Sequence, residues 1–183
     1  MTAIDYDLEF LEDGRTIELI SIGMVCDDGR EYYAVNRDMP VRRIRKHKWL
    51  MENVVPHLPK GQGDQRITMP KRWLFHYADR RVKSRKQIAN EVRDFIQGAG
   101  PDVELWANYG AYDHVCLAQL WGRMIDLPEG VPMSTHDIQQ ERARLGLAWD
   151  DLPQQENGEH NALADARHNQ TVRRWLAEQA GAR

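Results

Sequence analysis

The sequence predicts an α/β protein whose helices flank one mixed β-sheet. Three short apolar segments separated by Asp-Gly turns occupy the first 36 residues, a pattern typical of consecutive β-hairpins. After residue 84, amphipathic segments alternate with short apolar strands, which is the order expected of an α/β sheet protein. A length of 183 residues with 42% hydrophobic and 29% charged residues predicts one domain spanning residues 1–183.

The opening segments predict a three-stranded antiparallel meander. Residues 4–10, 16–25 and 31–35 are rich in aliphatic and aromatic side chains, which favour strands. Asp13-Gly14 and Asp28-Gly29 stand between them, and Asp-Gly is a favoured dipeptide of tight hairpin turns. Each of these strands should therefore pair with the next one along the chain.

The middle of the chain predicts two helices joined by a loop. Residues 47–55 form a short candidate helix, and residues 56–71 are rich in proline and glycine, which is typical of a loop. Residues 84–97 predict an amphipathic helix, because Ser84 is a suitable N-cap and Gly98 a suitable stop. The apolar side chains of this helix share one face, which should pack on the sheet.

The last third of the chain completes the α/β alternation. Residues 103–107 predict an apolar strand, and residues 132–135 a second, brief one. Helices are expected over residues 112–124, 137–145 and 161–179. Because these helices lie between or after strands, they should cover the faces of the same sheet.

Charge is distributed unevenly along the chain. Residues 37–86 hold 15 Lys and Arg but 4 Asp and Glu, a net charge of +11, whereas the other residues together carry −14. We interpret this basic stretch as an insertion within the domain. It either attracts an anionic ligand toward an acidic centre or forms an ordinary solvated surface, and charge alone favours neither.

Aromatic residues are interspersed in the basic stretch. Such residues stack on nucleic-acid bases in single-strand binding proteins, but more often they anchor a long segment to the core. We favour the second interpretation for each of the four: Trp49, Trp73, Phe75 and Tyr77.

Three acids alternate along the first predicted strand. Asp5, Asp7 and Glu9 point to one face of it, since side chains alternate between the faces of a strand. Carboxylates on a central strand are costly unless they are paired or bind a metal. Asp7 and Glu9 lie toward the carboxyl end, where open α/β sheets bind ligands, whereas Asp5 should be structural or solvent-exposed.

Two later segments carry further candidates. Asp113 follows the strand over residues 103–107 after a glycine turn, although an acid in the first turn of a helix is also explained by the helix dipole. His160 and Asp165 can share one site if His160 lies in the loop before the last helix and Asp165 lies within that helix. Taken singly, each is as well explained as an ordinary surface residue. The neighbours His168 and Asn169 either touch this site or are exposed, and we favour exposure.

Together these side chains predict a metal centre. Carboxylate oxygens are the ligands that Mg²⁺ and Mn²⁺ prefer, and two such ions form the clamp used in phosphoryl displacement. A histidine at this centre has a pKa suited to a general base near neutral pH.

Three motifs in this order resemble those of the DEDDh 3′–5′ exonuclease family. Asp7-Leu8-Glu9, followed by the strand TIELISIG, resembles the D-x-E motif of that family. Residues 108–113 (NYGAYD) resemble its second motif, with Tyr112 where phenylalanine is usual. His160 and Asp165 resemble its third motif, in which four residues separate a histidine from an aspartate.

The resemblance covers the chain from about Tyr6 to Trp175, and the opening segment is most similar to the mycobacterial, RNase AS-like branch of the family. It implies an RNase H-like fold with a five-stranded mixed sheet flanked by helices. It also implies two divalent ions, Mg²⁺ or Mn²⁺, held by four carboxylates: Asp7, Glu9, Asp113 and Asp165.

The resemblance further implies how the site works. His160 would activate the attacking water as the general base, and Glu9 would contact the terminal 3′-hydroxyl. Further substrate contacts are implied for three residues: Leu8, Phe10 and Asn108. The implied reaction releases nucleoside 5′-monophosphates from the 3′ ends of single-stranded RNA. Members of the RNase AS-like and RNase T-like branches are homodimers, so a homodimer is implied as well.

Two other functions remain open at this point. A DNA-directed 3′–5′ exonuclease would use the same residues, because the two-metal chemistry does not involve the 2′-hydroxyl. A non-catalytic nucleic-acid-binding module would use the basic stretch alone and would bind in a salt-sensitive way.

Composition excludes other classes. No apolar run is long enough to span a bilayer, and the first ten residues carry three acids without the basic region of a signal peptide. Cys26 and Cys116 are too few for a disulfide scaffold or a four-thiolate zinc site. We therefore expect a cytoplasmic protein that does not act at membranes.

Overall fold

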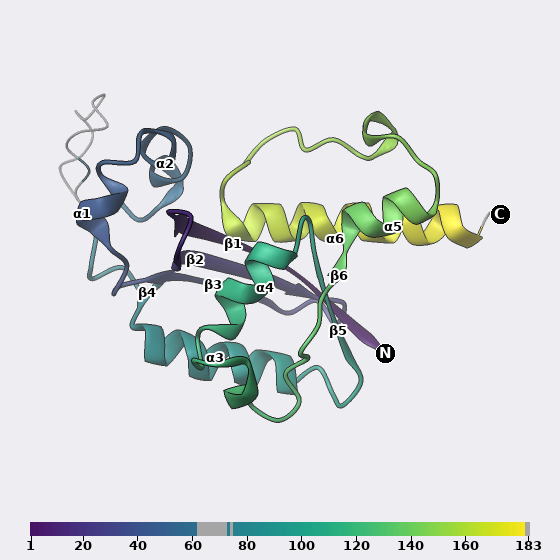
Figure 1. Cartoon of the computed structure of the whole chain (residues 1–183), viewed down its shortest axis with the longest axis horizontal. Coiled ribbons are helices and arrows are strands. Elements are labelled where there is room, and N and C mark those ends of the chain that lie inside the picture. The colour runs from purple at the N-terminus through teal and green to yellow at the C-terminus, as the bar shows by residue number, and fades with distance from the viewer. Residues whose placement is uncertain (62–72, 74, 182–183) are drawn as a thin grey trace.

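The computed structural model describes residues 1–61, 73 and 75–181 (Figure 1). Among these residues, six strands form one sheet in the order β4-β3-β2-β1-β5-β6. The strands are β1 (Thr2–Glu12), β2 (Ile17–Cys26), β3 (Glu31–Asn36), β4 (Val82–Lys83), β5 (Val103–Ala107) and β6 (His136–Asp137).

Six α-helices accompany the sheet in the described residues: α1 (Val41–Ile44), α2 (Lys48–Asn53), α3 (Arg85–Gln97), α4 (Ala111–Ala118), α5 (Ile138–Arg144) and α6 (Ala162–Gly181). Short 3₁₀ helices lie at η1 (Val55–His57), η4 (Met124–Asp126) and η5 (Trp149–Asp151).

The sheet is mixed, as the sequence predicts. β1, β2 and β3 pair antiparallel in the expected meander, whereas β5 runs parallel to β1 and β6 parallel to β5. The sheet has six strands instead of the five expected, because the two-residue strand β4 also pairs, in parallel, with β3. So short a strand carries almost no hydrophobic periodicity that a sequence pattern could reveal.

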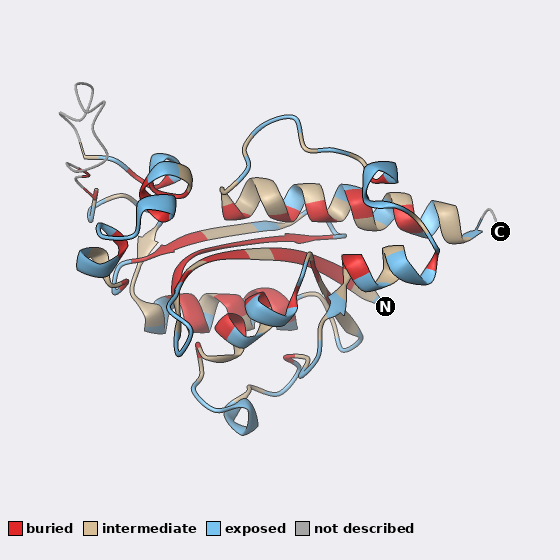
Figure 2. Cartoon of the chain, turned by 45° about the horizontal axis from the view of Figure 1, so that its top comes forward, coloured by how far each residue is buried: buried red, intermediate tan, exposed pale blue. Residues whose placement is uncertain are grey.

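The helices cover both faces of the sheet. α5 and α6 lie on one face, and α3 and α4 lie on the other (Figure 1). Buried residues line the sheet and the helix faces turned toward it (Figure 2). The main core joins β1 and β2 to α3 and α4, and a smaller cluster joins α5 to α6. The α/β class is therefore confirmed.

Two predicted elements are corrected by the structure. The helix expected over residues 112–124 ends at Ala118, and the chain turns before Gly122, whose φ of +106° no α-helix accommodates. The strand expected over residues 132–135 lies instead at His136–Asp137, where it pairs with β5. There the ring of His136 stacks on Trp106 with centroids 4.6 Å apart.

The basic stretch contributes α1 and α2 and a second apolar cluster. Residues 62–71 of the loop predicted over 56–71 lie outside the described residues. Trp73 and Phe75 are buried in this cluster with residues of α1, α2 and β3, so for them the anchoring interpretation is confirmed. Trp49 and Tyr77 are about half exposed. Trp49 packs on His160 and Tyr77 on Phe75, so for these two the anchoring interpretation stays a prediction.

Candidate active site

The acids of β1 face α6. Asp5 is completely buried, and both of its carboxylate oxygens accept hydrogen bonds from the Arg173 guanidinium, the shortest at 2.8 Å. Asp5 is therefore structural, which was one of the two roles expected for it, and it is not exposed to solvent. Asp7 and Glu9 follow at two-residue intervals on the same face of the strand.

Helix α6 is locked against β1 along one line of side chains. Asp165, Asn169 and Arg173 recur every four residues and so share one face of the helix. The Asn169 amide donates to the carbonyl of Tyr6 at 3.0 Å, one helical turn before the Arg173 ion pair. These two contacts fix the position of α6 along β1 and bring Asp165 beside Asp7 and Glu9.

Close packing at the start of α6 completes this placement. A Cβ atom on Gly23 of β2 would lie 2.3 Å from the backbone of Ala162, so only glycine permits this approach. Ala162 and Ala166 are fully buried, and their small side chains leave room for the helix to rest on the strands.

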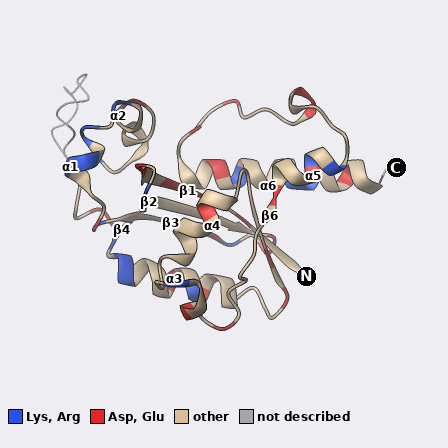
Figure 3. Ribbon diagram, in the orientation of Figure 1, with Lys and Arg blue, Asp and Glu red and all other residues tan. Residues whose placement is uncertain are grey.

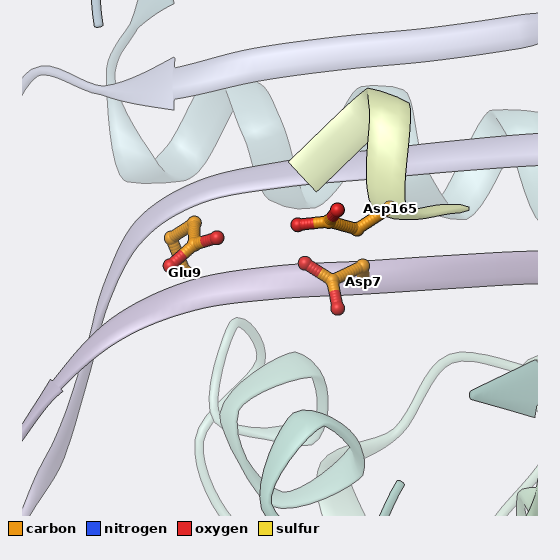
Figure 4. A group of neighbouring side chains, drawn as sticks. All are labelled: Asp7, Glu9 and Asp165. Atoms are coloured by element: carbon orange, nitrogen blue, oxygen red, sulfur yellow. The ribbon is translucent and has the colours of Figure 1, made fainter. Parts of the chain in front are cut away.

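Three carboxylates meet where β1 and α6 touch. One oxygen from each of Asp7, Glu9 and Asp165 lies within 4.8 Å of the other two. The carboxylates converge on a common space, two from the strand and one from the first turn of the helix (Figure 4). A β-bulge directly after Glu9 shifts the pairing of β1 with β2, and bulges commonly re-aim side chains next to active sites.

Asp113 reaches the same centre from the opposite face of the sheet. It lies in the first turn of α4, is 6% exposed, and accepts a 2.8 Å hydrogen bond from the backbone N–H of Leu8. This contact places the aspartate at the strand between Asp7 and Glu9. A favourable helix dipole alone does not explain a carboxylate buried against a neighbouring strand.

Burial raises the pKa values of these acids, and for Asp7, Glu9 and Asp113 the neighbouring carboxylates add to it. Burial raises the pKa of Glu9 to about 8, and the charges of Asp165 and Asp113 add to the effect. Burial also raises the pKa of Asp113 to about 7, although the Leu8 N–H partly opposes it. The pKa of Asp7 is raised by burial and by the neighbouring carboxylates, and that of Asp165 by burial. A cation among these oxygens would relieve the repulsion.

His160 lies in the loop that leads into α6. Its backbone is left-handed, with φ of +64°, and the turn is closed by a hydrogen bond from Asn161 N–H to the Gly158 carbonyl at 3.2 Å. The side chain of Gln155, from the same loop, donates to Asp165 at 2.8 Å. Loop and helix therefore present His160 and Asp165 to one space.

A cavity of about 310 Å³ joins all these elements. The structure gathers around it the eight residues singled out from the sequence: Asp7, Leu8, Glu9, Phe10, Asn108, Asp113, His160 and Asp165. Four further residues, none of them predicted as site residues, complete its lining: Gln155, Glu159, His168 and Asn169.

The expectation that His168 and Asn169 are exposed is wrong, because both line this cavity and Asn169 is 4% exposed. The four-residue spacing from Asp165 to Asn169 was the available signal, since it places both on one helix face. Gln155 and Glu159 lie in an irregular loop whose path no sequence periodicity reveals.

The basic stretch lies beside this acidic centre. Lys and Arg residues cluster along α1, α2 and the start of α3, whereas acidic residues lie at the starts of α4 and α6 (Figure 3). Several of the cations are used within the fold: Arg43 pairs with Asp13 at 2.6 Å, and Arg81 with Asp79 at 2.8 Å. Lys48 is 86% exposed, so part of the stretch remains open to solvent.

Fold and site together define an α/β protein with an acidic centre suited to hard divalent cations. A family model described as a 3′-5′ exoribonuclease Rv2179c-like domain matches residues 69–176. Two relatives from strains of Mycobacterium tuberculosis, 3′-5′ exoribonuclease Rv2179c and 3′-5′ exoribonuclease MT2234.1, are each 41% identical over 168 residues. The alignment covers 88% of this chain and 85% of each relative.

The chain belongs to the Rv2179c-like 3′-5′ exoribonuclease family. The sequence resemblance to a mycobacterial exoribonuclease branch is thereby confirmed. A solved structure of Schizosaccharomyces pombe Pop2p in its Mg²⁺- and Mn²⁺-bound form aligns with a TM-score of 0.48 and 12% identity, covering 97% of this chain and 82% of that one. In the described residues, no helix has the length and apolar character needed to cross a bilayer.

Proposed function

We propose that this protein is a metal-dependent 3′–5′ exoribonuclease that shortens single-stranded RNA from its 3′ end and releases nucleoside 5′-monophosphates. The observation that carries the proposal is the convergence of four carboxylates and one histidine on a single cavity. Membership of the exoribonuclease family supports the choice of RNA over DNA.

The donor set fits a pair of divalent ions. All four acidic side chains offer oxygen, which suits Mg²⁺ or Mn²⁺. Their raised pKa values support a site for positive charge, because a cation stabilises neighbouring carboxylates. The residues that would hold the ions are Asp7, Glu9, Asp113 and Asp165. When bound, the ions supply the charge that polarises the phosphate and stabilises the leaving oxygen.

The protein's own groups supply the remaining functions. His160 accepts the proton of the attacking water as the general base. Glu9 contacts the terminal 3′-hydroxyl, and Leu8, Phe10 and Asn108 line the part of the cavity that receives the last nucleotide. The backbone N–H of Leu8 already donates to Asp113. Leu8 therefore contacts the nucleotide as part of the cavity wall, and its N–H is not a free donor for the substrate.

A test uses a 5′-labelled single-stranded RNA and the DNA of the same sequence, each with Mg²⁺ or Mn²⁺, with products resolved by length. The wild-type protein should produce a ladder from the 3′ end of the RNA, and EDTA or Asp7→Asn should abolish it. His160→Ala should lower turnover by about 10²- to 10⁴-fold and leave metal binding intact. Salt-sensitive RNA binding without any ladder would overturn the proposal in favour of a binding module, and equal ladders on both substrates would overturn the RNA preference.

We propose further that residues 1–183 form one exonuclease domain with a basic insertion at about 37–86. Contacts between the two ends of the chain support this, since Arg173 pairs with Asp5 and Ala162 packs on Gly23. Limited proteolysis should therefore not release a stable half of the molecule.

A homodimer is proposed from the resemblance to dimeric branches of the family. Light scattering coupled to size-exclusion chromatography tests it, and a monomer at micromolar concentration would contradict it.

A cytoplasmic setting is proposed because both cysteines are buried free thiols, which suit a reducing compartment. Fractionation of the source cells tests that location.

A further inference from the structure

Trp49 of α2 reaches the active site from the basic stretch. Its indole meets the imidazole of His160 with ring centroids 4.8 Å apart and planes at 73°, an edge-to-face contact. The side chain is nevertheless 48% exposed. Trp49 therefore links helix α2 of the basic stretch directly to the candidate general base.

Helix α2 is well placed to hold this contact. The side chain of His47 accepts a hydrogen bond from the N–H of Leu50 and so caps the helix. Leu50 and Met51 are buried in the second apolar cluster together with Trp73. The helix is thus anchored through one face, while Trp49 projects from it toward the loop before α6.

The imidazole of His160 needs such support. Its residue lies in a left-handed backbone conformation within an irregular loop, and in the described part of the chain no hydrogen bond or ion pair engages the ring. General bases are usually oriented by a third group. Among the described residues, the edge-to-face contact with Trp49 is the aromatic contact that limits rotation of the ring.

We propose that Trp49 is a positioning residue that acts through His160, and that the basic stretch serves the active site by carrying it. The inference rests on the exoribonuclease function proposed above, with His160 as the general base. Trp49 fixes the plane of the imidazole and thereby the direction in which its nitrogen faces the attacking water. It does not itself touch the reacting atoms.

A double-mutant cycle separates this role from stacking on RNA. Trp49→Ala should lower kcat by about two- to tenfold, the effect of one aromatic contact, and leave KM unchanged. Trp49→Phe should restore most of kcat, because an aromatic edge or face is kept. In a His160→Ala background, Trp49→Ala should have no further effect, since residues that act as a unit are non-additive.

Tyr77→Ala is the matched control. Tyr77 is another exposed aromatic of the basic stretch, and it packs on Phe75 with centroids 4.8 Å apart. It should retain the wild-type kcat. A rise in KM on Trp49→Ala, equal with and without His160, would overturn the proposal and show that Trp49 stacks on RNA. A fall in kcat that Trp49→Phe does not restore would overturn it as well.

A readout without turnover keeps the two proposals distinguishable. Labelling with 5-fluorotryptophan gives a ¹⁹F resonance for Trp49, assigned by its loss in Trp49→Phe. This resonance should shift in His160→Ala and stay in place in Tyr77→Ala. If the wild type hydrolyses no RNA but the resonance shifts, the exoribonuclease proposal fails while the contact stands. If the resonance does not move in His160→Ala, the positioning proposal is wrong.

Discussion

Replacing Glu9 by glutamine should stabilise the metal-free protein, even though it removes a proposed metal ligand. Glu9 is 8% exposed, and one of its oxygens lies within 4.8 Å of carboxylate oxygens of Asp7 and Asp165. Glutamine keeps the size of the side chain and removes its charge. The repulsion that a bound cation would relieve is thereby relieved by the substitution.

The magnitude follows from the geometry. Two unit charges at this upper limit of 4.8 Å repel by about 3 kcal/mol at an effective dielectric constant of about 20. For a chain of this length, about 1 kcal/mol corresponds to about 2–4 °C in Tm. The Tm of Glu9→Gln in EDTA should therefore exceed that of the wild type by about 6–12 °C when the carboxylates are ionised.

The pH dependence has a definite sign. The pKa of Glu9 is about 8 in the folded protein and 4.5 in its usual range. The folded state therefore binds the proton more tightly, so the stabilisation that protonated Glu9 contributes is complete below pH 4.5 and is lost as pH rises to about 8. The advantage of glutamine should be under about 1 kcal/mol at pH 5 and complete above pH 8.

Thermal unfolding in EDTA at pH 5 and pH 8.5 measures this effect. Glu178→Gln is the matched control, since Glu178 is an exposed carboxylate of α6, and it should change stability by less than about 0.5 kcal/mol. An unchanged or lower Tm for Glu9→Gln at pH 8.5 would refute the reasoning, because it would mean that the carboxylates are not crowded in solution.

Three further predictions follow from the same contacts. Mg²⁺ or Mn²⁺ should raise the wild-type Tm more at pH 8 than at pH 6, because the ligands must lose protons to bind; equal shifts in differential scanning fluorimetry would contradict this. Gly23→Ala should lower the free energy of unfolding in urea by about 3 kcal/mol or more and impair hydrolysis, because the added Cβ would lie 2.3 Å from the start of α6. Gly181→Ala should be nearly neutral, because an added Cβ there would have nothing within 4 Å. Arg173→Ala should lower the free energy of unfolding by about 3–5 kcal/mol, because it leaves Asp5 buried without its partner. Arg174→Ala, at a side chain that is 54% exposed, should lower it by less than about 1 kcal/mol. Comparable losses for the two arginine variants would disprove the buried pair.

Local signals predicted most of the regular structure. The Asp-Gly turns predicted the meander, and Ser84 and Gly98 predicted both ends of α3, where the Ser84 hydroxyl accepts from Gln87 N–H at 3.2 Å. These signals succeed because turn and cap preferences depend on a few neighbouring residues. The predicted end of α4 was wrong, because the apolar pattern of the sequence continues past the point where the chain turns at Gly122.

The residues of the candidate site were predicted from their types and order along the chain. How deeply the neighbouring residues are buried was not predicted. Alternation along β1 predicted that Asp7 and Glu9 share a face, and the motif order placed Asp113, His160 and Asp165 with them; their catalytic and metal-binding roles stay predictions. That Asn169 is buried against the carbonyl of Tyr6 depends on the height at which α6 lies on β1, a tertiary quantity.

The sequence by itself determined the α/β class, the strands of the meander and the set of acids with chemical potential, because periodicity, turns and motif spacing are local properties of the chain. Only the tertiary structure decided that Gly23 admits α6 to within contact of the sheet, that Asp5 is neutralised while Asp7 and Glu9 are left crowded, and that Trp49 meets His160. These are contacts between segments far apart in sequence, and they are set by how whole faces pack, which no local pattern encodes.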